Sequence, residues 1–275
     1  MEERDNELQA VLTEMLAWFH QFCKMHQLRY YMLGGTMLGA VRHGGFIPWD
    51  DDIDVGMPRE DYRRLEQLMK ENPSDVYILE TPNTENPDYF YSYSKLYDTR
   101  TTLIENTRVT VKRGVFLDIF PLDGAGDNRQ DSIAYYQPIK RNLTLLLSMT
   151  TGIREGRKAY KNLAVRLLRC VPKCLLDPKK LLLHIQQMCG QKSFDQCAWI
   201  GNFAGAHREK EIVPREVMGE PTEYTFENIR VYGVKDYEAY LTSLYGNWRE
   251  LPPVEKQVTH HDFISCDLHK SYLEH

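Results

Sequence analysis

Residues 30–55 read Y-Y-M-L-G-G-T-M-L-G-A-V-R-H-G-G-F-I-P-W-D-D-D-I-D-V, and this stretch decides the fold that we expect. Near its end, the apolar residues Ile53 and Val55 alternate with the carboxylates Asp52 and Asp54. Successive side chains of a strand point to opposite faces, so the pattern predicts a strand with both carboxylates on one face. The rise of a strand then separates the two carboxylates by about 6–7 Å.

Two carboxylates at this spacing indicate a cation site, because like charges held close together are costly unless a cation joins them. Mg²⁺ suits Asp52 and Asp54, since this ion prefers oxygen ligands and keeps positions for water or substrate phosphate. Mn²⁺ is the alternative ion. A solvated acidic loop or a surface calcium site is the simpler interpretation, although the run lacks the glycine and the distal glutamate of an EF-hand loop.

A turn of small residues precedes a short helix predicted over residues 37–41. Gly34 and Gly35 allow the backbone to approach a ligand closely, and Thr36 is suited to cap the helix. The N-terminus of a helix favours an anion such as phosphate. An ordinary strand-to-helix turn is the simpler interpretation, and the spacing fits neither the dinucleotide fingerprint nor the P-loop. Turn and carboxylates together favour a site that handles phosphate.

Three further side chains are candidate substrate ligands, and each has a simpler interpretation. Arg42 can bind phosphate through two parallel hydrogen bonds, or it can pair with a nearby aspartate. Trp49 can form an aromatic wall against a quaternary ammonium group, or it can pack in the core. Lys95 lies on a strand predicted over residues 89–97, where it can meet a phosphate as a point charge or point into solvent.

A third carboxylate lies on a later apolar strand. In V-F-L-D-I-F, residues 115–120, Asp118 projects from an alternating run of apolar side chains. A lone charge in such a strand must be paired or bind a metal. We therefore predict that Asp118 completes a metal site with Asp52 and Asp54. It is also a candidate acceptor for the proton of an attacking hydroxyl.

Hydrophobic periodicity predicts the other elements. Apolar residues at spacings of three and four predict a long helix over residues 8–23, which would cover one face of the sheet. Short strands are predicted over residues 29–33 and 76–80. Further helices are predicted to start at Pro58 and to span residues 133–147 and 163–168. Asp123, next to Gly124, is predicted to lie in a turn.

The opening stretch and several later blocks resemble the LicD family. The resemblance is carried by the run from G-G-T to D-D-D-I-D-V, by S-K-L-Y-D-T-R-T-T, by G-V-F-L-D-I-F-P-L-D-G, and by the later T-F-E-N and L-Y-G blocks. It spans about residues 28–262. LicD proteins are phosphocholine transferases of the nucleotidyltransferase-like superfamily, to which fukutin-related proteins also belong.

The resemblance implies a fold and a reaction. The implied fold is α/β (α+β), a nucleotidyltransferase-like mixed β-sheet core flanked by helices, with a largely helical C-terminal portion. Residues 1–126 would form the catalytic core with its covering helix, and residues 127–275 would complete the domain. The implied reaction is Mg²⁺-dependent transfer of phosphocholine from CDP-choline to a hydroxyl of a cell-surface glycan or its lipid-linked precursor, of the lipopolysaccharide or teichoic-acid type, with release of CMP.

Other functions fit the same residues. A CDP-ribitol or CDP-glycerol donor, or nucleotidyl transfer to a small molecule, would use the same metal site, because that site handles phosphate and says little about the attached group. A protein that only binds glycans or nucleotides is the alternative outside enzymes. The intact set of Asp52, Asp54 and Asp118 argues against it.

The C-terminal blocks add candidates for the substrate pocket. The resemblance places a substrate-binding histidine at His260 or the adjacent His261. His207 stands where other members commonly have an aromatic residue. Each histidine is a candidate general base, although histidines near a chain end are more often structural. The candidate pocket aromatics, for which core packing is the simpler interpretation, are Tyr224, Tyr245 and Trp248.

The composition is that of a globular protein, and it gives no reason to expect a nucleic-acid partner. The chain has 34 basic and 39 acidic residues, a net charge of −5, and 42% hydrophobic residues. The N-terminal M-E-E-R-D has no apolar segment of the secretory type, and no apolar run approaches the roughly 18 residues needed to span a bilayer. The six cysteines show no C-x-x-C pair. A cytoplasmic location is therefore expected.

One segment reverses the overall charge. Residues 154–181 carry nine Lys or Arg and two acidic residues. A solvated helix face is the simpler interpretation. The sharper one is a surface for a polyanionic acceptor or for anionic lipid, the latter through peripheral contact with the inner face of the cell membrane.

Overall fold

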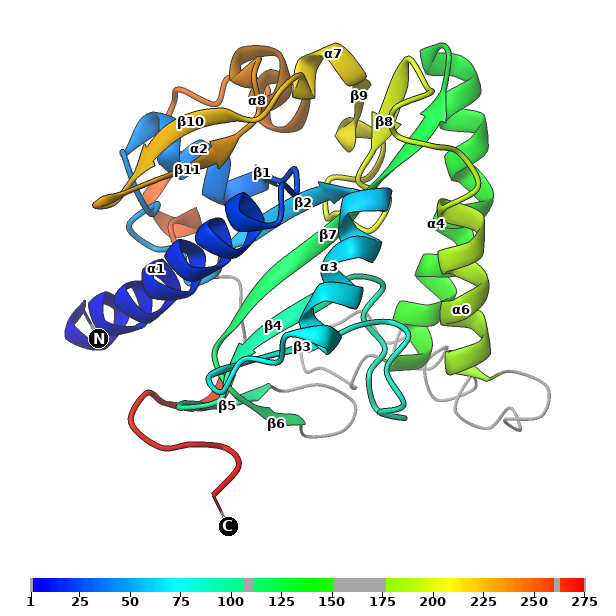
Figure 1. Ribbon diagram of the computed structural model, residues 1–275. Coiled ribbons are helices and arrows are strands. Elements are labelled where there is room, and N and C mark those ends of the chain that lie inside the picture. The colour runs from blue at the N-terminus through cyan, green and yellow to red at the C-terminus, as the bar shows by residue number, and fades with distance from the viewer. Residues whose placement is uncertain (1, 106–110, 151–176, 260–262, 275) are drawn as a thin grey trace.

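The chain folds around one mixed β-sheet, which confirms the predicted α/β class. The structure, a computed structural model, describes residues 2–105, 111–150, 177–259 and 263–274. The strands of the main sheet in this part of the chain are β1 (Tyr31–Met32), β2 (Asp54–Pro58), β3 (Tyr77–Glu80), β4 (Ser94–Asp98), β7 (Phe116–Gly126), β8 (Trp199–Gly201), β9 (Ile212–Pro214), β10 (Thr222–Phe226) and β11 (Ile229–Gly233). Their order is β10-β11-β1-β2-β7-β4-β3, and β8 joins β7 to β9 (Figure 1).

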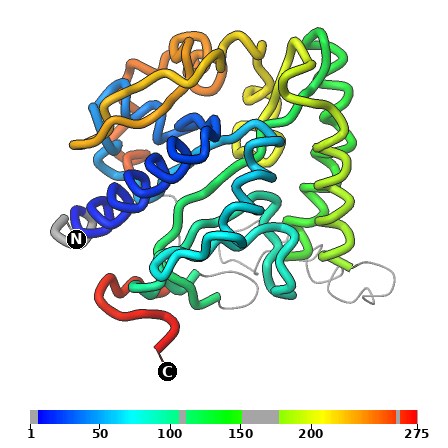
Figure 2. The backbone as a smooth tube through the Cα atoms, in the orientation of Figure 1, coloured from blue at the N-terminus to red at the C-terminus, as the bar shows by residue number. Residues whose placement is uncertain are grey.

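A smaller sheet lies below the main one. Its strands are β5 (Thr102–Glu105), β6 (Val111–Arg113) and β12 (Phe263–Asp267), in the order β12-β5-β6. The C-terminal segment thus returns to pair with β5, as the red end of the tube in Figure 2 shows.

Helices cover the main sheet. They are α1 (Glu2–Met25), α2 (Gly34–Arg42), α3 (Arg59–Glu71), α4 (Arg129–Thr150), α6 (Pro178–Cys189), α7 (Arg215–Met218) and α8 (Tyr237–Tyr245), with short 3₁₀ turns η1 (Arg208–Glu211) and η2 (Val254–Lys256). In Figure 1, α1 and α3 cross the side of the sheet that faces the viewer, and α4 and α6 pack together at one end. Helix α2 contacts α8.

The long first helix is amphipathic, as the periodicity predicted. Its buried side chains are Leu8, Leu12, Met15, Leu16, Phe19 and Cys23. They join the core cluster that also contains the apolar residues of β2 and β7. Burial of this face holds the helix against the sheet, because full burial of each large apolar side chain contributes about 1.5–3 kcal/mol.

The parallel pair of β2 and β7 forms the centre of the sheet. Their register places Asp54 opposite Asp118 and Val55 opposite Ile119. Strand β4 runs antiparallel on the other side of β7, with Lys95 opposite Asp118. Residues that are directly opposite in a sheet share a face, so the pairing aligns two carboxylates and one lysine in a row.

Several predicted elements begin at different residues in the structure, and three of them bear on the candidate site. Strand β2 starts at Asp54, so Asp52 precedes the strand instead of lying on it. Helix α2 starts at Gly34, before residue 37. The strand predicted over residues 89–97 is regular only from Ser94, because the tyrosines before it contact one another, and the Tyr89 hydroxyl donates to the Tyr93 carbonyl oxygen.

The predicted turn at Asp123 is wrong. Strand β7 continues to Gly126 with every residue buried. The Asp123 carboxylate accepts hydrogen bonds from Arg59 Nε and Nη2 at 2.8 and 2.5 Å. A buried carboxylate needs such a partner, and the arginine that supplies it lies 64 residues earlier in the chain.

The C-terminal portion contributes strands as well as helices. The hairpin of β10 and β11 joins the main sheet through parallel pairing of β11 with β1. Its turn residue Glu227 accepts a hydrogen bond from the backbone N–H of Phe46, and the Glu227 N–H donates to the Gly44 carbonyl oxygen. A Cβ atom on Gly45 would lie 1.9 Å from Glu227 Oε1, so the glutamate side chain could keep this position only beside glycine. The hairpin therefore holds the loop that leads into the aspartates.

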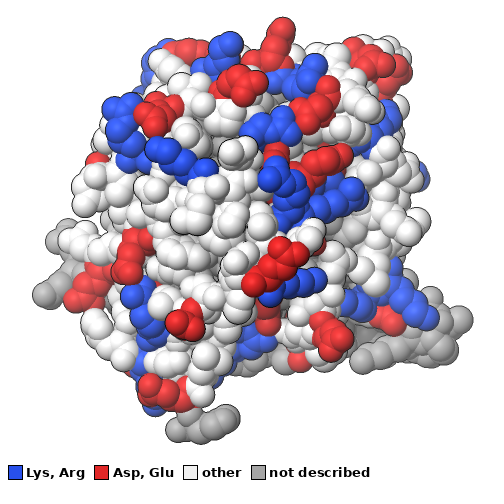
Figure 3. Space-filling view, in the orientation of Figure 1, with Lys and Arg blue, Asp and Glu red and all other residues white. Residues whose placement is uncertain are grey.

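Several predictions fall outside the described residues. They are the helix over residues 163–168, residues 154–176 of the basic segment, and both His260 and His261. In the part of the chain that the structure describes, no helix has both the length and the apolar character needed to cross a membrane. On the face shown in Figure 3, Lys and Arg are interspersed with Asp and Glu.

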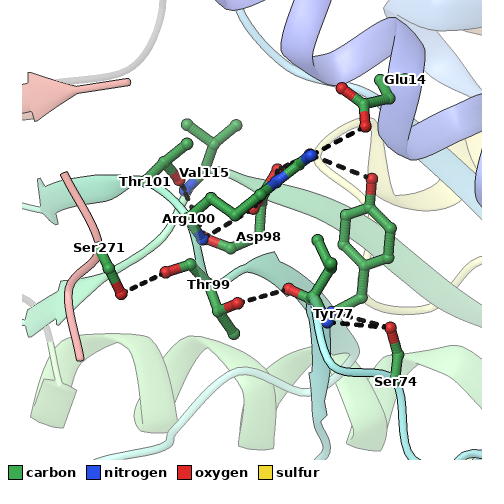
Figure 4. Close-up of polar contacts among 10 residues, drawn as sticks. Glu14, Ser74, Tyr77, Asp98, Thr99, Arg100, Thr101, Val115 and Ser271 are labelled. Atoms are coloured by element: carbon green, nitrogen blue, oxygen red, sulfur yellow. Dashed lines mark hydrogen bonds and ion pairs between the residues drawn. The ribbon is translucent and has the colours of Figure 1, made fainter. Parts of the chain in front are cut away.

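A buried network around Asp98 ties β4 to α1 and to the C-terminal segment (Figure 4). Asp98 is fully buried, and its Oδ1 accepts from Arg100 N at 2.9 Å while its Oδ2 accepts from Arg100 Nη2 at 2.7 Å. Arg100 also pairs with Glu14 of α1 at 3.0 Å. Nearby, the Ser271 hydroxyl donates to the Thr99 carbonyl oxygen. The carboxylate of Asp98 thus fixes the turn between β4 and β5.

We expect Asp98→Ala to lower the free energy of unfolding by about 2–3 kcal/mol, because it removes a buried acceptor from several donors. Glu14→Ala is the matched control. It removes the exposed partner of the same arginine and should cost less than about 1 kcal/mol. Urea unfolding followed by circular dichroism measures both, and equal losses in the two variants would contradict the role given to Asp98.

Candidate functional site

The aspartates that follow Trp49 gather into a cation-sized group. Among the described residues, one set of three or more metal-ligating side chains has ligand atoms all within 4.8 Å of one another, and it consists of Asp50, Asp51 and Asp52. Each of the three is half-buried. The predicted metal site placed Asp52 with Asp54 and Asp118, whereas the structure groups it with Asp50 and Asp51, which belong to the same acidic run of the sequence.

Asp54 and Asp118 lie beside this group on neighbouring strands. Asp54 faces Asp118 across the β2–β7 pair, and the backbone N–H of Asp118 donates to the Ile53 carbonyl oxygen at 2.9 Å. The structure therefore brings Asp54 and Asp118 together as predicted. It does not place Asp52, Asp54 and Asp118 within a single 4.8 Å set, so their joint binding of one ion stays a prediction.

The crowding of carboxylates changes their acidity. Burial, followed by the negative charges of Asp52 and Asp118, raises the pKa of Asp54 well above its ordinary value. Burial also raises the pKa of Asp118 to about 6, and the positive charge of Lys95 opposes this rise. Both shifts mean that deprotonation here is costly without an added positive charge. A divalent cation with oxygen ligands fits this donor set.

The small-residue turn lies directly against these carboxylates. Gly34 has a φ of +48°, a left-handed conformation that favours glycine. A Cβ atom on Gly34 would lie 3.5 Å from Asp54 Oδ2, and one on Gly35 would lie 2.7 Å from Asp50 Oδ2. The glycines thus leave room for carboxylates. Whether they also position phosphate oxygens stays a prediction.

Thr36 does not cap the helix as predicted. Helix α2 has no side-chain cap, and the Thr36 hydroxyl instead accepts the backbone N–H of Asp54 at 2.9 Å. Thr36 is buried, so this bond satisfies a donor that would otherwise lack a partner at the start of β2. The threonine therefore fixes the first residue of the carboxylate strand.

The solvent-exposed alternative for Lys95 is wrong. Lys95 is 2% exposed, and its Nζ lies 3.0 Å from Asp118 Oδ1 and 3.9 Å from Glu105 Oε1. The lysine thus lies beside Asp118, and its nearest charged partner is a carboxylate of this chain. Its predicted contact with a substrate phosphate stays untested.

Arg42 and Trp49 have structural contacts. Arg42 Nη1 donates to the Trp248 carbonyl oxygen at 2.8 Å, and no ion pair joins it to an aspartate among the described residues. This contact holds the end of α2 against the C-terminal portion. Trp49 is half-buried and packs against the core, which favours the packing interpretation. Roles for either residue in substrate binding stay predictions.

Side chains of the C-terminal portion lie beside the turn at Gly34, and most of these contacts were not predicted from the sequence. Helix α8 places the Tyr240 hydroxyl 3.1 Å from the backbone N of Gly34, which donates to it. The Tyr245 hydroxyl would lie 3.8 Å from a Cβ on Gly34, and the His207 ring lies edge-on to Tyr245 at 4.7 Å between centroids. Tyr245, a predicted pocket aromatic, thus reaches the turn, while Tyr240 was not predicted.

Glu211 is a further carboxylate that the sequence did not single out. It is 5% exposed and accepts the His207 backbone N–H at 2.8 Å. Burial raises the pKa of Glu211 to about 7, and the charge of Glu211 in turn raises the pKa values of Tyr240 and Asp54. In the sequence, Glu211 is visible only as the residue before the run I-V-P, residues 212–214. Only the fold shows that this segment lies beside the aspartates.

The other predicted pocket aromatics belong to the core. The Tyr224 hydroxyl donates to the Val234 carbonyl oxygen, and its ring contacts Tyr237. Trp248 is 6% exposed and also contacts Tyr237. These contacts favour packing as their role.

Residues 27–142 match a known family, described as "LicD/FKTN/FKRP, nucleotidyltransferase domain". The match contains the small-residue turn, the aspartates and Asp118. The match ends before Glu211 and α8.

Individual relatives extend the similarity. The lipopolysaccharide cholinephosphotransferase LicD of Haemophilus influenzae is 29% identical over 263 residues, which are 93% of this chain and 95% of that protein. The ribitol 5-phosphate transferase FKRP of Homo sapiens is 54% identical over 41 residues, 15% of this chain and 8% of that protein. Mannosyltransferase regulator 4 of Saccharomyces cerevisiae is 28% identical over 135 residues, 47% of this chain and 11% of that protein.

The raised pKa of Asp118 predicts a pH dependence of stability. The folded protein holds this proton up to about pH 6, whereas an unfolded aspartate loses it near pH 4. The contribution of Asp118 to the free energy of unfolding is therefore fully present below about pH 4. It amounts to at most about 3 kcal/mol and is lost as the pH rises to about 6. Asp118→Asn cannot ionise, so without divalent ions its free energy of unfolding should rise relative to the wild type between pH 4.5 and 7.

Urea titrations in a chelator at several pH values measure this difference. Comparison of the wild type with Asp118→Asn cancels the titration of histidines and other groups that do not interact with Asp118, whereas Asp54, whose pKa depends on the charge of Asp118, contributes to the measured difference. Added Mg²⁺ should stabilise the wild type more at pH 7.5 than at pH 5, because only the deprotonated carboxylates bind it strongly. A constant difference between wild type and Asp118→Asn over this range would contradict the assigned pKa shift.

Proposed function

Residues 27–142 of this chain form a nucleotidyltransferase domain of the LicD/FKTN/FKRP family, and from that premise we propose that the protein is a phosphotransferase. It transfers a phospho-alcohol group from a cytidine diphosphate donor to a hydroxyl of a glycan or a lipid-linked glycan, with release of CMP. The proposal rests on the gathering of carboxylates beside the turn at Gly34. Asp50, Asp51 and Asp52 form one group, and Asp54 lies opposite Asp118 on the neighbouring strand. This is an arrangement that suits phosphate bound through a metal ion.

Mg²⁺, with Mn²⁺ as the alternative, is the proposed cofactor. Asp52, Asp54 and Asp118 would hold it, with Asp50 and Asp51 as additional oxygen donors, since the crowded carboxylates favour a cation between them. When bound, such an ion neutralises charge on the donor pyrophosphate and orients it. Without it, the same carboxylates would repel the anionic donor.

The side chains around the ion divide the remaining work. Asp118 is the proposed acceptor of the proton from the attacking hydroxyl. Arg42 and the first turn of α2, at Gly34, Gly35 and Thr36, are proposed to orient the donor phosphates. His260 is proposed to contact the substrate, as the family resemblance implies.

The surroundings of Asp54 favour a cationic alcohol. Glu211 and the aspartate group add negative charge, while Tyr245 and His207 supply ring edges and faces. A quaternary ammonium group is stabilised by carboxylates and aromatic faces, whereas a polyol gains little from either. Phosphocholine is therefore the proposed group, in agreement with the name of the relative from Haemophilus influenzae, a lipopolysaccharide cholinephosphotransferase. Ribitol phosphate or glycerol phosphate is the alternative, favoured by the short match to the ribitol 5-phosphate transferase.

CMP release in the presence of Mg²⁺ and a panel of CDP-choline, CDP-ribitol and CDP-glycerol tests the proposal. With a glycan acceptor present, CDP-choline should be consumed fastest. Preference for CDP-ribitol would select the alternative donor. Consumption of a nucleoside triphosphate alone, with transfer of the nucleotide, would contradict phospho-alcohol transfer.

The variant Asp52→Asn should lower the rate of CMP release by at least about a hundredfold, because it removes a ligand from the proposed ion. Its matched control is Asp88→Asn, a carboxylate on an exposed loop far from β2 in sequence. The control should keep the wild-type rate, and thermal unfolding should show that both variants are folded. Unchanged turnover in Asp52→Asn would remove this residue from the mechanism, and the absence of any turnover in the wild type would favour a protein that only binds its ligands.

A further inference from the structure

Lys95 is a buried cation in an aromatic cage. Its Nζ lies 3.2 Å from the ring centroid of Phe116, 4.5 Å from that of Tyr91 and 5.7 Å from that of Tyr93. Rings at such distances stabilise an ammonium group through their negative faces. Cages of this kind bind quaternary ammonium ligands in other proteins, but here the ammonium group belongs to the chain itself.

Two carboxylates complete the surroundings of this ammonium group. Asp118 Oδ1 lies 3.0 Å from Lys95 Nζ, and Glu105 Oε1 lies 3.9 Å from it. The Tyr91 hydroxyl donates to the same Glu105 oxygen at 3.1 Å, so the cage and the ion pairs support one another. A buried charge is costly unless it is paired, and leaving this cage would forfeit every one of these contacts. Lys95 is thus fixed in place.

The position of Lys95 relative to the other carboxylates is set by the sheet. Lys95, Asp118 and Asp54 are directly opposite one another on β4, β7 and β2. Neighbouring strands lie about 4.8 Å apart, so the three side chains form a row on one face. Asp118 lies between a cation on one side and the aspartates on the other.

Phosphoryl-transfer sites with two metal ions hold the ions about 3.5–4 Å apart. In this chain the side of Asp118 that faces β4 already has a cation at 3.0 Å. A second divalent ion on that oxygen would have to approach the ammonium group closely, and like charges at that distance repel strongly in a buried site.

We propose that the Lys95 ammonium group occupies the second cation position of the carboxylate site, so that the chain binds one divalent ion, on the side of Asp118 that faces Asp54. Lys95 is then a positioning residue that fixes Asp118 and neutralises part of its charge, in place of a mobile ligand for substrate phosphate. This inference rests on the metal-dependent reaction proposed above, and it concerns how many ions that reaction uses.

Titration of the protein with Mn²⁺ alone tests the inference without any turnover. Binding is measured as the loss of the electron paramagnetic resonance signal of the free ion. The wild type should bind one Mn²⁺ per chain. Lys95→Met keeps an apolar stem within the cage and removes the charge. It should bind Mn²⁺ at least about tenfold more tightly or take up a second ion, because the carboxylates lose their fixed cation. A lysine that only supports the fold would, when replaced, weaken Mn²⁺ binding through disorder of Asp118.

Lys192→Met is the matched control. Lys192 also contacts a ring, with its Nζ 4.4 Å from the Tyr135 centroid, but it donates to the Ala125 carbonyl oxygen and forms no ion pair among the described residues. Its replacement should leave both the number and the affinity of bound Mn²⁺ unchanged. Lys95→Arg, which keeps the charge, should also bind one ion.

The outcomes separate this inference from the proposed function. Two Mn²⁺ ions per wild-type chain would overturn the inference while leaving the metal-dependent transfer intact. Weaker or unchanged binding by a folded Lys95→Met protein would also overturn it. No Mn²⁺ binding by the wild type would instead contradict the metal on which the proposed reaction depends. The wild-type ion count decides the question even if Lys95→Met does not fold.

Discussion

The parallel pairing of β2 with β7 is the constraint on which the site depends. It places Asp54 opposite Asp118, while the chain just before β2 gathers three more aspartates. So many negative charges in one place oppose folding unless cations or protons balance them. Burial, together with the neighbouring negative charges, raises the pKa values of both strand aspartates, and the buried Lys95 supplies a balancing positive charge. A bound divalent ion would balance more of this negative charge.

The loop and turn around these aspartates are held by residues far away in the chain. Glu227 binds the N–H of Phe46 from 181 residues later, and both the Trp248 carbonyl oxygen and the Tyr240 hydroxyl bind groups of α2 from 206 residues later. Each contact uses a backbone group or a planar side chain with a defined direction, so small displacements would break it. The C-terminal portion therefore acts as a clamp on the stretch that carries the chemistry, and it adds Glu211 and Tyr245 to the same site.

Sequence patterns predicted the strands β1 to β4 and β7 and the helices α1 to α4, although not where they begin, and they gave no prediction for β5, β6, β8 to β12 or α8. Alternation identified the apolar strand around Asp118, yet it could not show that β7 runs on to Gly126, because Pro121 and Gly124 read as a strand end and a turn. The strand continues past both residues because Arg59 pairs with Asp123 and every residue of β7 is buried. Likewise, Thr36 read as a helix cap. Its hydroxyl bonds the N–H of Asp54, a partner that becomes available only when β2 lies beside α2.

The sequence by itself determined which residues are candidates for the proposed chemistry: a glycine turn, the aspartates and an isolated carboxylate in an apolar strand, all of which are local patterns. Only the tertiary structure decided how these groups are balanced. Lys95 could be solvated, bind phosphate or pair with a carboxylate as far as its neighbours in sequence show. The register of β4 against β7, together with the rings that enclose its Nζ, placed it on Asp118. The same holds for Glu211 and Tyr240, because electrostatic and hydrogen-bonding partners are chosen by distance in space, and strand pairing sets that distance.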